Sequence, residues 1–248
     1  MTGCPAVLIT GAAKRLGAAM ALEFHRQGYD LIIHCNDSLQ EAGQLAGQLN
    51  HRRRNSAMVL QADLTREQEV ATLARQAPLA FGRLDVLVNN ASAFYPTPFG
   101  QVSGHDWDAL VDSNLRGAFF LSQSLAGCLS QRQGAIVNLL DIYAEHPLKN
   151  YPVYSIAKAG LAAMTRALAV ELAPQVRVNG VAPGAILWPE HEQDASAIAA
   201  HQAILDKVPL GTTGSPGDIA AAAFFLAARA TYMTGEVIRV DGGRRLNL

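Results

Sequence analysis

The chain has few cysteines, almost no net charge and no long apolar run. Its three cysteines, Cys4, Cys35 and Cys128, are scattered without metal-ligand spacing, so we interpret them as reduced thiols of a cytoplasmic protein. A net charge of −1 provides no basic field for binding nucleic acid. No uninterrupted apolar run reaches the length of a membrane span, and the N-terminus has no signal-peptide pattern. We therefore expect neither a membrane location nor export.

Hydrophobic residues are plentiful instead, and they are regularly spaced. They make up 50% of the 248 residues, against 17% charged residues, which excludes a disordered chain. Linkers, repeats and low-complexity segments are lacking, so we expect a single domain, 1–248. The short apolar runs that we expect to be strands begin near Pro5, Asp30, Met58, Leu84, Ala135, Val176 and Glu236.

These runs are continuously apolar and alternate with helical segments. That pattern is typical of a parallel sheet covered by helices on both faces. Right-handed crossovers then give a doubly wound α/β sheet of about seven strands, with ligands at the carboxyl ends of the strands. Two helix starts are also expected. Ser38 and Glu41 have the spacing of a capping box, and Thr65 is placed to cap the helix that ends near Phe81.

A glycine turn follows the first strand directly. Thr10-Gly11 continues as Ala-Ala-Lys-Arg-Leu-Gly17 and then as a helix to about Gln27. This layout directs backbone N–H groups and a helix N-terminus at a phosphate. The spacing differs from the common fingerprint Gly-x-Gly-x-x-Gly, so a plain tight turn explains this stretch, taken alone, equally well.

A tyrosine and a lysine stand four residues apart after the fifth expected strand. On a helix, Tyr154 and Lys158 share one face. An ammonium beside a phenol favours the phenolate, so we expect the pKa of Tyr154 to be lowered. Asp141, at the end of the preceding strand, is free to point into the same cleft. Taken alone, the pair also fits an ordinary helix surface.

Together these motifs resemble the short-chain dehydrogenase/reductase family over essentially the whole chain. The resemblance implies a Rossmann-type fold, a nicotinamide cofactor across the sheet edge and hydride transfer to a substrate beside Tyr154. Lys158 would hold the nicotinamide ribose, and Asn114 would support a proton-relay water. The matching pieces, in the family's order, are Thr10-Gly11 through Gly17, Asp63, Asn89-Asn90-Ala91, Asn114, Tyr154-x-x-x-Lys158, Pro183-Gly184 and Asp241-Gly242-Gly243.

Three departures resemble the pteridine reductase branch of that family. Arg15 stands where the family usually has a turn glycine, Ser92 where it has the glycine of Asn-Asn-Ala-Gly, and Asp141 where it has a catalytic serine. The branch reduces pterins, and often folates, with NADPH, and the family is usually tetrameric. The resemblance therefore implies a dihydropterin or dihydrofolate substrate. The expected substrate-binding residues are Arg15, Ser92, Phe94, Asp141, Tyr154 and Trp188, the last within a covering segment at about 184–210.

Elementary chemistry agrees with this assignment. Phe94 can stack on a flat pterin ring, although it could also be plain core. Arg15 can donate to a pyrophosphate and to a pterin heteroatom through its planar fork. Asp141 beside Tyr154 can hand a proton to a ring nitrogen.

Two alternatives remain open. One is a carbonyl reductase of 3-oxoacyl thioesters or sugars, which Asp141 disfavours because a carboxylate is a poor partner for a developing alkoxide. The other is a non-catalytic dinucleotide-binding protein. The presence of Asn114, Tyr154 and Lys158 disfavours it, because a binder needs no proton relay.

The choice of cofactor depends on the tip of the second strand. An acidic residue there selects NADH, whereas His34 is not acidic and can donate to a 2′-phosphate. The negative charge of Asp37 would repel the 2′-phosphate, unless its carboxylate instead bonds the first N–H groups of the next helix. We expect a modest preference for NADPH, with NADH use not excluded. The expected cofactor-binding residues are Gly11, Lys14, Arg15, Leu16, Gly17, His34, Ser38, Asp63, Leu64, Asn90, Ala91, Ser92, Tyr154, Lys158, Pro183 and Gly184.

Overall fold

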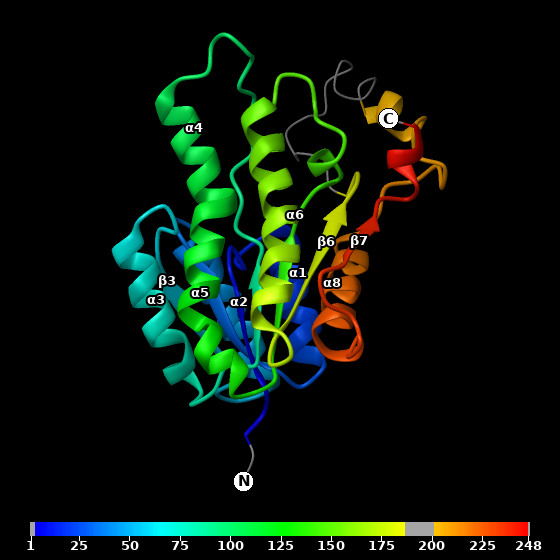
Figure 1. The fold of residues 1–248 in the computed structure, drawn as a ribbon. Coiled ribbons are helices and arrows are strands. Elements are labelled where there is room, and N and C mark those ends of the chain that lie inside the picture. The colour runs from blue at the N-terminus through cyan, green and yellow to red at the C-terminus, as the bar shows by residue number, and fades with distance from the viewer. Residues whose placement is uncertain (1–2, 187–200, 248) are drawn as a thin grey trace.

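Seven strands pair in parallel to form one sheet, in the order β3-β2-β1-β4-β5-β6-β7. The structure, a computed structural model, describes residues 3–186 and 201–247 (Figure 1). The expected doubly wound sheet of about seven strands is confirmed. The strands are β1 (Ala6–Ile9), β2 (Asp30–Cys35), β3 (Ala57–Gln61), β4 (Val86–Asn89), β5 (Ala135–Leu139), β6 (Arg177–Pro183) and β7 (Val237–Val240).

Helices cover both faces of the sheet. Helices α1, α2 and α8 pack on one face, and α3, α5 and α6 pack on the other (Figure 1). One turn of π-helix, Asp112–Arg116, joins α4 to α5, and another, Phe225–Arg229, follows α8. The helices are α1 (Arg15–Arg26), α2 (Leu39–Arg52), α3 (Glu67–Ala80), α4 (Gly104–Val111), α5 (Gly117–Ser130), α6 (Pro152–Leu172) and α8 (Pro216–Phe224).

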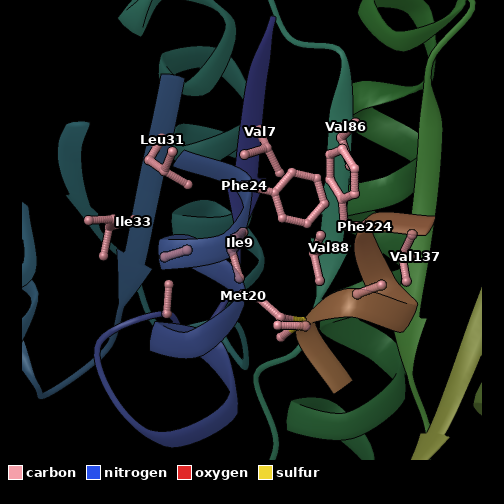
Figure 2. Packing of buried hydrophobic residues seen from close by; sticks show 14 of the residues in the cluster. Val7, Ile9, Met20, Phe24, Leu31, Ile33, Val86, Val88, Val137 and Phe224 are labelled. Atoms are coloured by element: carbon pink, nitrogen blue, oxygen red, sulfur yellow. The ribbon is translucent and has the colours of Figure 1, made fainter. Parts of the chain in front are cut away.

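Alternate residues of each strand supply two separate cores. Val7 and Ile9 face α1 and α8, whereas Leu8 between them faces the other helical layer. In the first core the Phe24 ring meets the ring of Phe224 edge-on, with centroids 5.4 Å apart (Figure 2). Because helices cover both faces of the sheet, its carboxyl edge, where the chain turns back, is left as the place for a ligand.

The two expected helix caps are wrong. Ser38 precedes α2, but its side chain bonds no helix N–H, and Glu41 pairs with Lys14 instead. The hydroxyl and N–H of Thr65 both donate to Asp63, and α3 begins two residues later. In both cases another residue binds a side chain that the local pattern had assigned to the helix terminus. Lys14 pairs with Glu41, and Asp63 accepts the hydroxyl of Thr65.

The longest helix, α6, places the Tyr154/Lys158 pair at the carboxyl edge of the sheet. By length and composition alone, its 21 residues could span a bilayer. More than half of its most apolar stretch is buried inside the fold, however, as in the core helix of a water-soluble protein. Tyr154 and Lys158 lie in its first two turns and are themselves buried.

Candidate active site

A cleft of about 1180 Å³ runs along the carboxyl edge of the sheet. The residues expected to act in catalysis or to bind cofactor or substrate line it, with two exceptions. Asn114 is buried and does not line the cleft. Trp188, with most of the expected covering segment, lies outside the described residues. The carboxyl ends of β1, β2, β4, β5 and β6 thus bring together side chains that are far apart in the sequence.

The glycine turn forms one end of this cleft, and its shape depends on the absence of side chains. Gly11 has φ +60°, and a Cβ on Gly17 would lie 2.2 Å from the carbonyl oxygen of Gly11. The Thr10 hydroxyl accepts the N–H groups of Asn90 and Ala91, both at 2.9 Å. The Asn90 amide in turn donates to the Thr10 and Gly11 carbonyls. A rigid turn before the N-terminus of α1 fits the pyrophosphate of a dinucleotide.

Arg15 occupies a backbone position suited to glycine. Its φ is +51°, a left-handed conformation that costs a residue with a Cβ about 1–2 kcal/mol. The Arg15 side chain lines the cleft and is exposed to solvent. The chain thus keeps the backbone geometry that a glycine would adopt here and adds a guanidinium at the mouth of the cleft.

His34 has a structural role, and the expectation that it donates to a 2′-phosphate is wrong. Its Nδ1 accepts the N–H of Gly11 at 3.1 Å, and its Nε2 donates to the Ala62 carbonyl at 3.0 Å. Both ring nitrogens are therefore occupied. Burial lowers the pKa of His34 to about 4, so the ring is neutral at physiological pH. The His34 side chain therefore holds the glycine turn through its hydrogen bond with the Gly11 N–H.

The exposed charges near the tip of β2 are Lys14, Asp37 and Glu41. Lys14 Nζ lies 2.6 Å from Glu41 Oε1, and both side chains are about half exposed. Asp37 is exposed, and among the described residues its carboxylate accepts a hydrogen bond only from the Asn36 amide, at 3.5 Å. Its carboxylate therefore does not cap α2. Lys14 also lines the cleft, so its ion pair with Glu41 lies at the edge of that space.

The other end of the cleft holds Asp141, Tyr154 and Lys158. Asp141 begins a short 3₁₀ turn after β5, where its Oδ1 accepts the N–H of Tyr143 at 3.0 Å. Its Oδ2 accepts the hydroxyl of Tyr154 at 2.8 Å. Lys158 Nζ donates to the Leu139 carbonyl at 2.8 Å and lies 5.7 Å from the centre of the Tyr154 ring. The expected acid–tyrosine contact therefore forms directly.

Burial changes the acidity of all three groups. It raises the pKa of Asp141, although the hydrogen bonds from Tyr143 and Tyr154 work in the opposite direction. It lowers the pKa of Lys158 to about 8. Burial, followed by the charge of Asp141, raises the pKa of Tyr154 well above its ordinary value. The expectation of a lowered pKa for Tyr154 is therefore wrong: desolvation and the neighbouring carboxylate outweigh the lysine.

Asn114 and Ser92 hold the loop that follows β4. Asn114 lies in the π-helical turn, and its amide donates to the Ala93 carbonyl at 2.9 Å and to the Leu110 carbonyl at 3.0 Å. The Ser92 hydroxyl donates to Asn114 Oδ1 at 2.7 Å. π-Helical turns inside α-helices are often found at functional sites. Here the turn fixes the loop that carries Phe94, and the relay-water role of Asn114 stays a prediction.

Phe94 is a wall of the cleft rather than part of the core. Its side chain is 52% exposed. One face of the ring stacks on Tyr151, with centroids 4.6 Å apart and planes 12° apart, and the Tyr154 ring meets it edge-on at 4.8 Å. This arrangement is a flat aromatic platform beside the acid–tyrosine pair.

Several further residues line the cleft and were not expected, among them Tyr143, Tyr151 and Arg244. Tyr151 stands three residues before Tyr154, so its helical spacing could have suggested it. Tyr143 follows Asp141 closely in the chain, but nothing in the sequence indicates its direction. Arg244 reaches the site only because the chain turns sharply at Gly242 and Gly243, and no local pattern predicts that contact.

Comparisons with known proteins agree with this geometry. A family model described as enoyl-(acyl carrier protein) reductase matches residues 11–245. Pteridine reductase 1 of Leishmania tarentolae is 36% identical, over 98% of this chain and 96% of its own length. A 3beta-hydroxysteroid dehydrogenase of Eggerthella lenta is 33% identical, over 97% and 93% respectively. A 3-oxoacyl-(acyl-carrier-protein) reductase of Staphylococcus aureus is 32% identical, over 95% and 96%.

Proposed function

The chain belongs to the short-chain dehydrogenase/reductase family of oxidoreductases, which use nicotinamide dinucleotides, and we propose that it reduces dihydropterins with NADPH. Dihydrofolate is a second substrate of the same chemistry. The observation that carries the proposal is the 2.8 Å hydrogen bond from the Tyr154 hydroxyl to the carboxyl of Asp141. An acid pair of this kind suits a ring nitrogen that gains a proton, and the aromatic platform of Phe94 lies beside it.

The residues present fit a bound NADPH. The glycine turn at Gly11 and Gly17 leaves room for the pyrophosphate. Lys14 would meet the 2′-phosphate, and Lys158 would hold the nicotinamide ribose. When bound, NADPH supplies the hydride. The protein then has to deliver a proton to the nitrogen next to the carbon that receives it.

Asp141 and Tyr154 deliver that proton as a unit. Asp141 is the stronger acid of the two, because the pKa of Tyr154 is raised well above its ordinary value. Burial raises the pKa of Asp141 towards neutrality, so its protonated form persists to a higher pH than for an exposed carboxyl. Tyr154 therefore passes its hydroxyl proton to the substrate nitrogen and regains one from Asp141. The charge of Lys158 stabilises the negative charge that remains on the pair once the proton has left.

Phe94 orients the substrate ring. Tyr151 covers one face of the phenyl ring, and the edge of Tyr154 fixes its tilt. A pterin stacked on the remaining surface would lie within reach of the Tyr154 hydroxyl. Such positioning of the two reacting partners lowers the barrier by restricting their motion before the reaction.

A carbonyl reductase is the second candidate, supported by the similarity to a hydroxysteroid dehydrogenase and a 3-oxoacyl reductase. Ketone reduction passes through a developing alkoxide, which needs a neutral or positive donor beside it. The carboxyl of Asp141 would repel that alkoxide whenever it is ionised. The acid–tyrosine contact therefore favours the pterin over the ketone.

The test follows NADPH oxidation by the purified enzyme. The substrates are 7,8-dihydrobiopterin, 7,8-dihydroneopterin, dihydrofolate, a 3-oxoacyl thioester and a simple ketone. We expect turnover with the dihydropterins, or with dihydrofolate, and little with the carbonyl compounds. Ready turnover of the thioester or ketone, together with none of any pterin, would contradict the proposal. The non-catalytic alternative predicts NADPH binding without oxidation of any substrate.

We also propose that the enzyme works in the cytoplasm as a homotetramer. The outward face of α6 exposes Ile156 (52%) and Val170 (78%), with small alanines between them. A stripe of this kind permits close packing of two helices. Light scattering measures the mass in solution, and Ala163→Arg should lower it. A wild-type mass equal to one chain would contradict the assembly alone.

A further inference from the structure

A smaller chamber of about 400 Å³ adjoins the substrate end of the cleft. Four of its six lining residues, Tyr143, Leu148, Lys207 and Arg244, also line the main cleft, so the two spaces share a wall. The remaining two are His146 and Pro147. The proposed reaction gives none of these residues a role.

The chamber is electropositive. Arg244 and Lys207 each carry a positive charge, and His146 adds an imidazole. The described residues that line the chamber include no carboxylate. Charges of one sign around a small concave space attract a ligand group of the opposite sign.

Arg244 is held in the chamber with hydrogen-bonding capacity left unused. Asp241 accepts the N–H groups of Gly243 and Arg245 at 3.0 and 2.9 Å, which fixes the turn after β7. The Arg244 side chain is buried, and its Nη2 donates to the Tyr143 hydroxyl at 2.9 Å. Its Nε is buried and has no hydrogen-bond partner among the described residues. A permanently charged guanidinium with an unfilled buried N–H is costly unless a ligand completes it.

The chamber lies next to the proton-delivering pair. Tyr143 donates its backbone N–H to Asp141, and its side chain accepts from Arg244, so one residue touches both sites. The charge of Arg244 also works to lower the pKa of Asp141. A substituent attached to a ring beside Tyr154 and Phe94 can therefore extend into the chamber.

We propose that this chamber binds a negatively charged group, a phosphate or a carboxylate, on the side chain of the substrate. The inference rests on the proposed function and names the substrate class within it: pterins that carry an anionic side chain. The planar fork of Arg244 suits two oxygens of such a group, and Lys207 adds a second charge. Uncharged pterins would bind the ring site and leave the chamber without its anion.

Two matched substrate pairs test this inference. 7,8-Dihydroneopterin and its 3′-monophosphate differ only in the phosphate, and the dimethyl ester of dihydrofolate replaces the two glutamyl charges by two methyl ester groups. We expect kcat/KM to be about tenfold or more higher for the anionic member of at least one pair, the usual scale of a charge-assisted hydrogen bond. The pair that shows the difference identifies phosphate or carboxylate as the group recognised.

Substitutions then locate the effect, and the readout is the ratio of kcat/KM within a pair. Arg244→Gln should lower the ratio about tenfold, and Arg244→Lys should restore part of it. Lys207→Gln should lower it about two- to threefold, because an exposed charge is screened. Tyr143→Phe removes the hydrogen bond without removing charge, so it should change both members of a pair alike. Lys149→Gln is the matched control, since Lys149 is exposed and lines neither space.

Three results would overturn the inference. They are a ratio near one for both pairs in the wild type, a ratio unaffected by Arg244→Gln, or an equal fall in Lys149→Gln and Lys207→Gln. Turnover of the pterins with any of these results would leave the proposed function standing. A complete lack of turnover with every pterin would refute the proposed function, and the role of the chamber with it.

Discussion

The two ends of the cleft handle ionisable groups in opposite ways. At the dinucleotide end, Lys14 and Asp37 are exposed and Glu41 is half-exposed, whereas the buried His34 is neutral and supports the turn. At the substrate end, Asp141, Tyr154 and Lys158 all have their pKa values shifted by burial. Exposed charges are screened by water and salt, whereas buried ones act strongly on each other.

This difference predicts how large the effects of substitution should be. Changes at the substrate end should alter the reaction rate by orders of magnitude. Changes to the exposed charges at the dinucleotide end should alter cofactor preference only slightly. Replacement of His34 should instead change the stability of the folded protein. The following substitutions either break that contrast or sharpen it.

The largest effect is expected from Tyr154→Phe. The phenyl ring keeps its edge contact with Phe94, but the proton donor is lost. We expect kcat to fall about 10²- to 10⁴-fold, the usual contribution of a general acid, while the Kd for NADPH changes little. Steady-state kinetics and fluorescence titration with NADPH measure the two quantities. The double variant with Asp141→Asn should lose less than the product of the single losses, and full additivity would indicate independent roles.

The pH dependence of the rate should report Asp141. The protonated carboxyl is the form that refills Tyr154, so activity is greatest below the pKa of Asp141 and falls as pH rises through it. Burial raises that pKa, which moves the fall towards neutral pH. In Asp141→Asn this group no longer titrates, so the remaining fall should lie at higher pH. A pH profile of kcat/KM with the same alkaline limb in both proteins would show that another group supplies the proton.

Phe94→Ala should weaken the binding of the substrate ring by about 1–3 kcal/mol, the usual scale for losing an aromatic partner of a flat heterocycle. NADPH binding to the free enzyme should be little changed. Isothermal titration with a dihydropterin, in the presence of NADP⁺, measures the loss. Tyr151→Phe is the control, because it keeps the stacked ring against Phe94. Normal pterin binding by Phe94→Ala would show that the platform carries no ligand.

Much of this contrast could be read from the sequence, because parallel strands place their carboxyl ends at one edge. Continuous apolar runs identified the strands, so Gly11, Asp141 and Tyr154 could be assigned to a common cleft. The contact between Asp141 and Tyr154 followed from the same reasoning. That inference required only that Asp141 follows the end of one strand and that Tyr154 lies near the start of the next helix.

Burial and distant partners could not be read in the same way. The sequence shows Lys158 one turn from Tyr154, but not that Asp141 and desolvation raise the pKa of that tyrosine. It shows His34 at a strand tip, but not that both ring nitrogens are already bonded. Arg244 bonds Tyr143 across 101 residues, a separation that no local pattern reports.

The pH dependence of stability tests whether His34 is a structural group rather than a cofactor contact. It is neutral in the folded chain down to about pH 4, whereas in the unfolded chain it is charged below its ordinary pKa of 6.5. The unfolded chain therefore binds more protons between these values, and stability falls as pH drops from 6.5 to 4. In His34→Gln the loss of unfolding free energy from pH 7 to pH 4.5 should be smaller by about 2 kcal/mol. Urea unfolding at both values measures it, and equal losses would mean that His34 is not the group responsible.

The smallest effect is expected at the exposed charges that choose the cofactor. Glu41 lies 2.6 Å from Lys14 and competes with a 2′-phosphate for it. Glu41→Gln should free Lys14 and raise the NADPH-to-NADH ratio of kcat/KM about two- to fivefold, the scale of an exposed ion pair.

Asp37→Arg should raise the same ratio further, because it replaces a repelling charge by one that can bond the phosphate. Both gains should shrink at high salt, because water and ions screen these groups. Glu171→Gln, an exposed acid far along α6, is the control for net charge. A wild type that prefers NADH, or an increase in the NADPH-to-NADH ratio that does not change with salt, would show that buried contacts determine the choice of cofactor. The contrast between the two ends of the cleft would then not hold for cofactor choice.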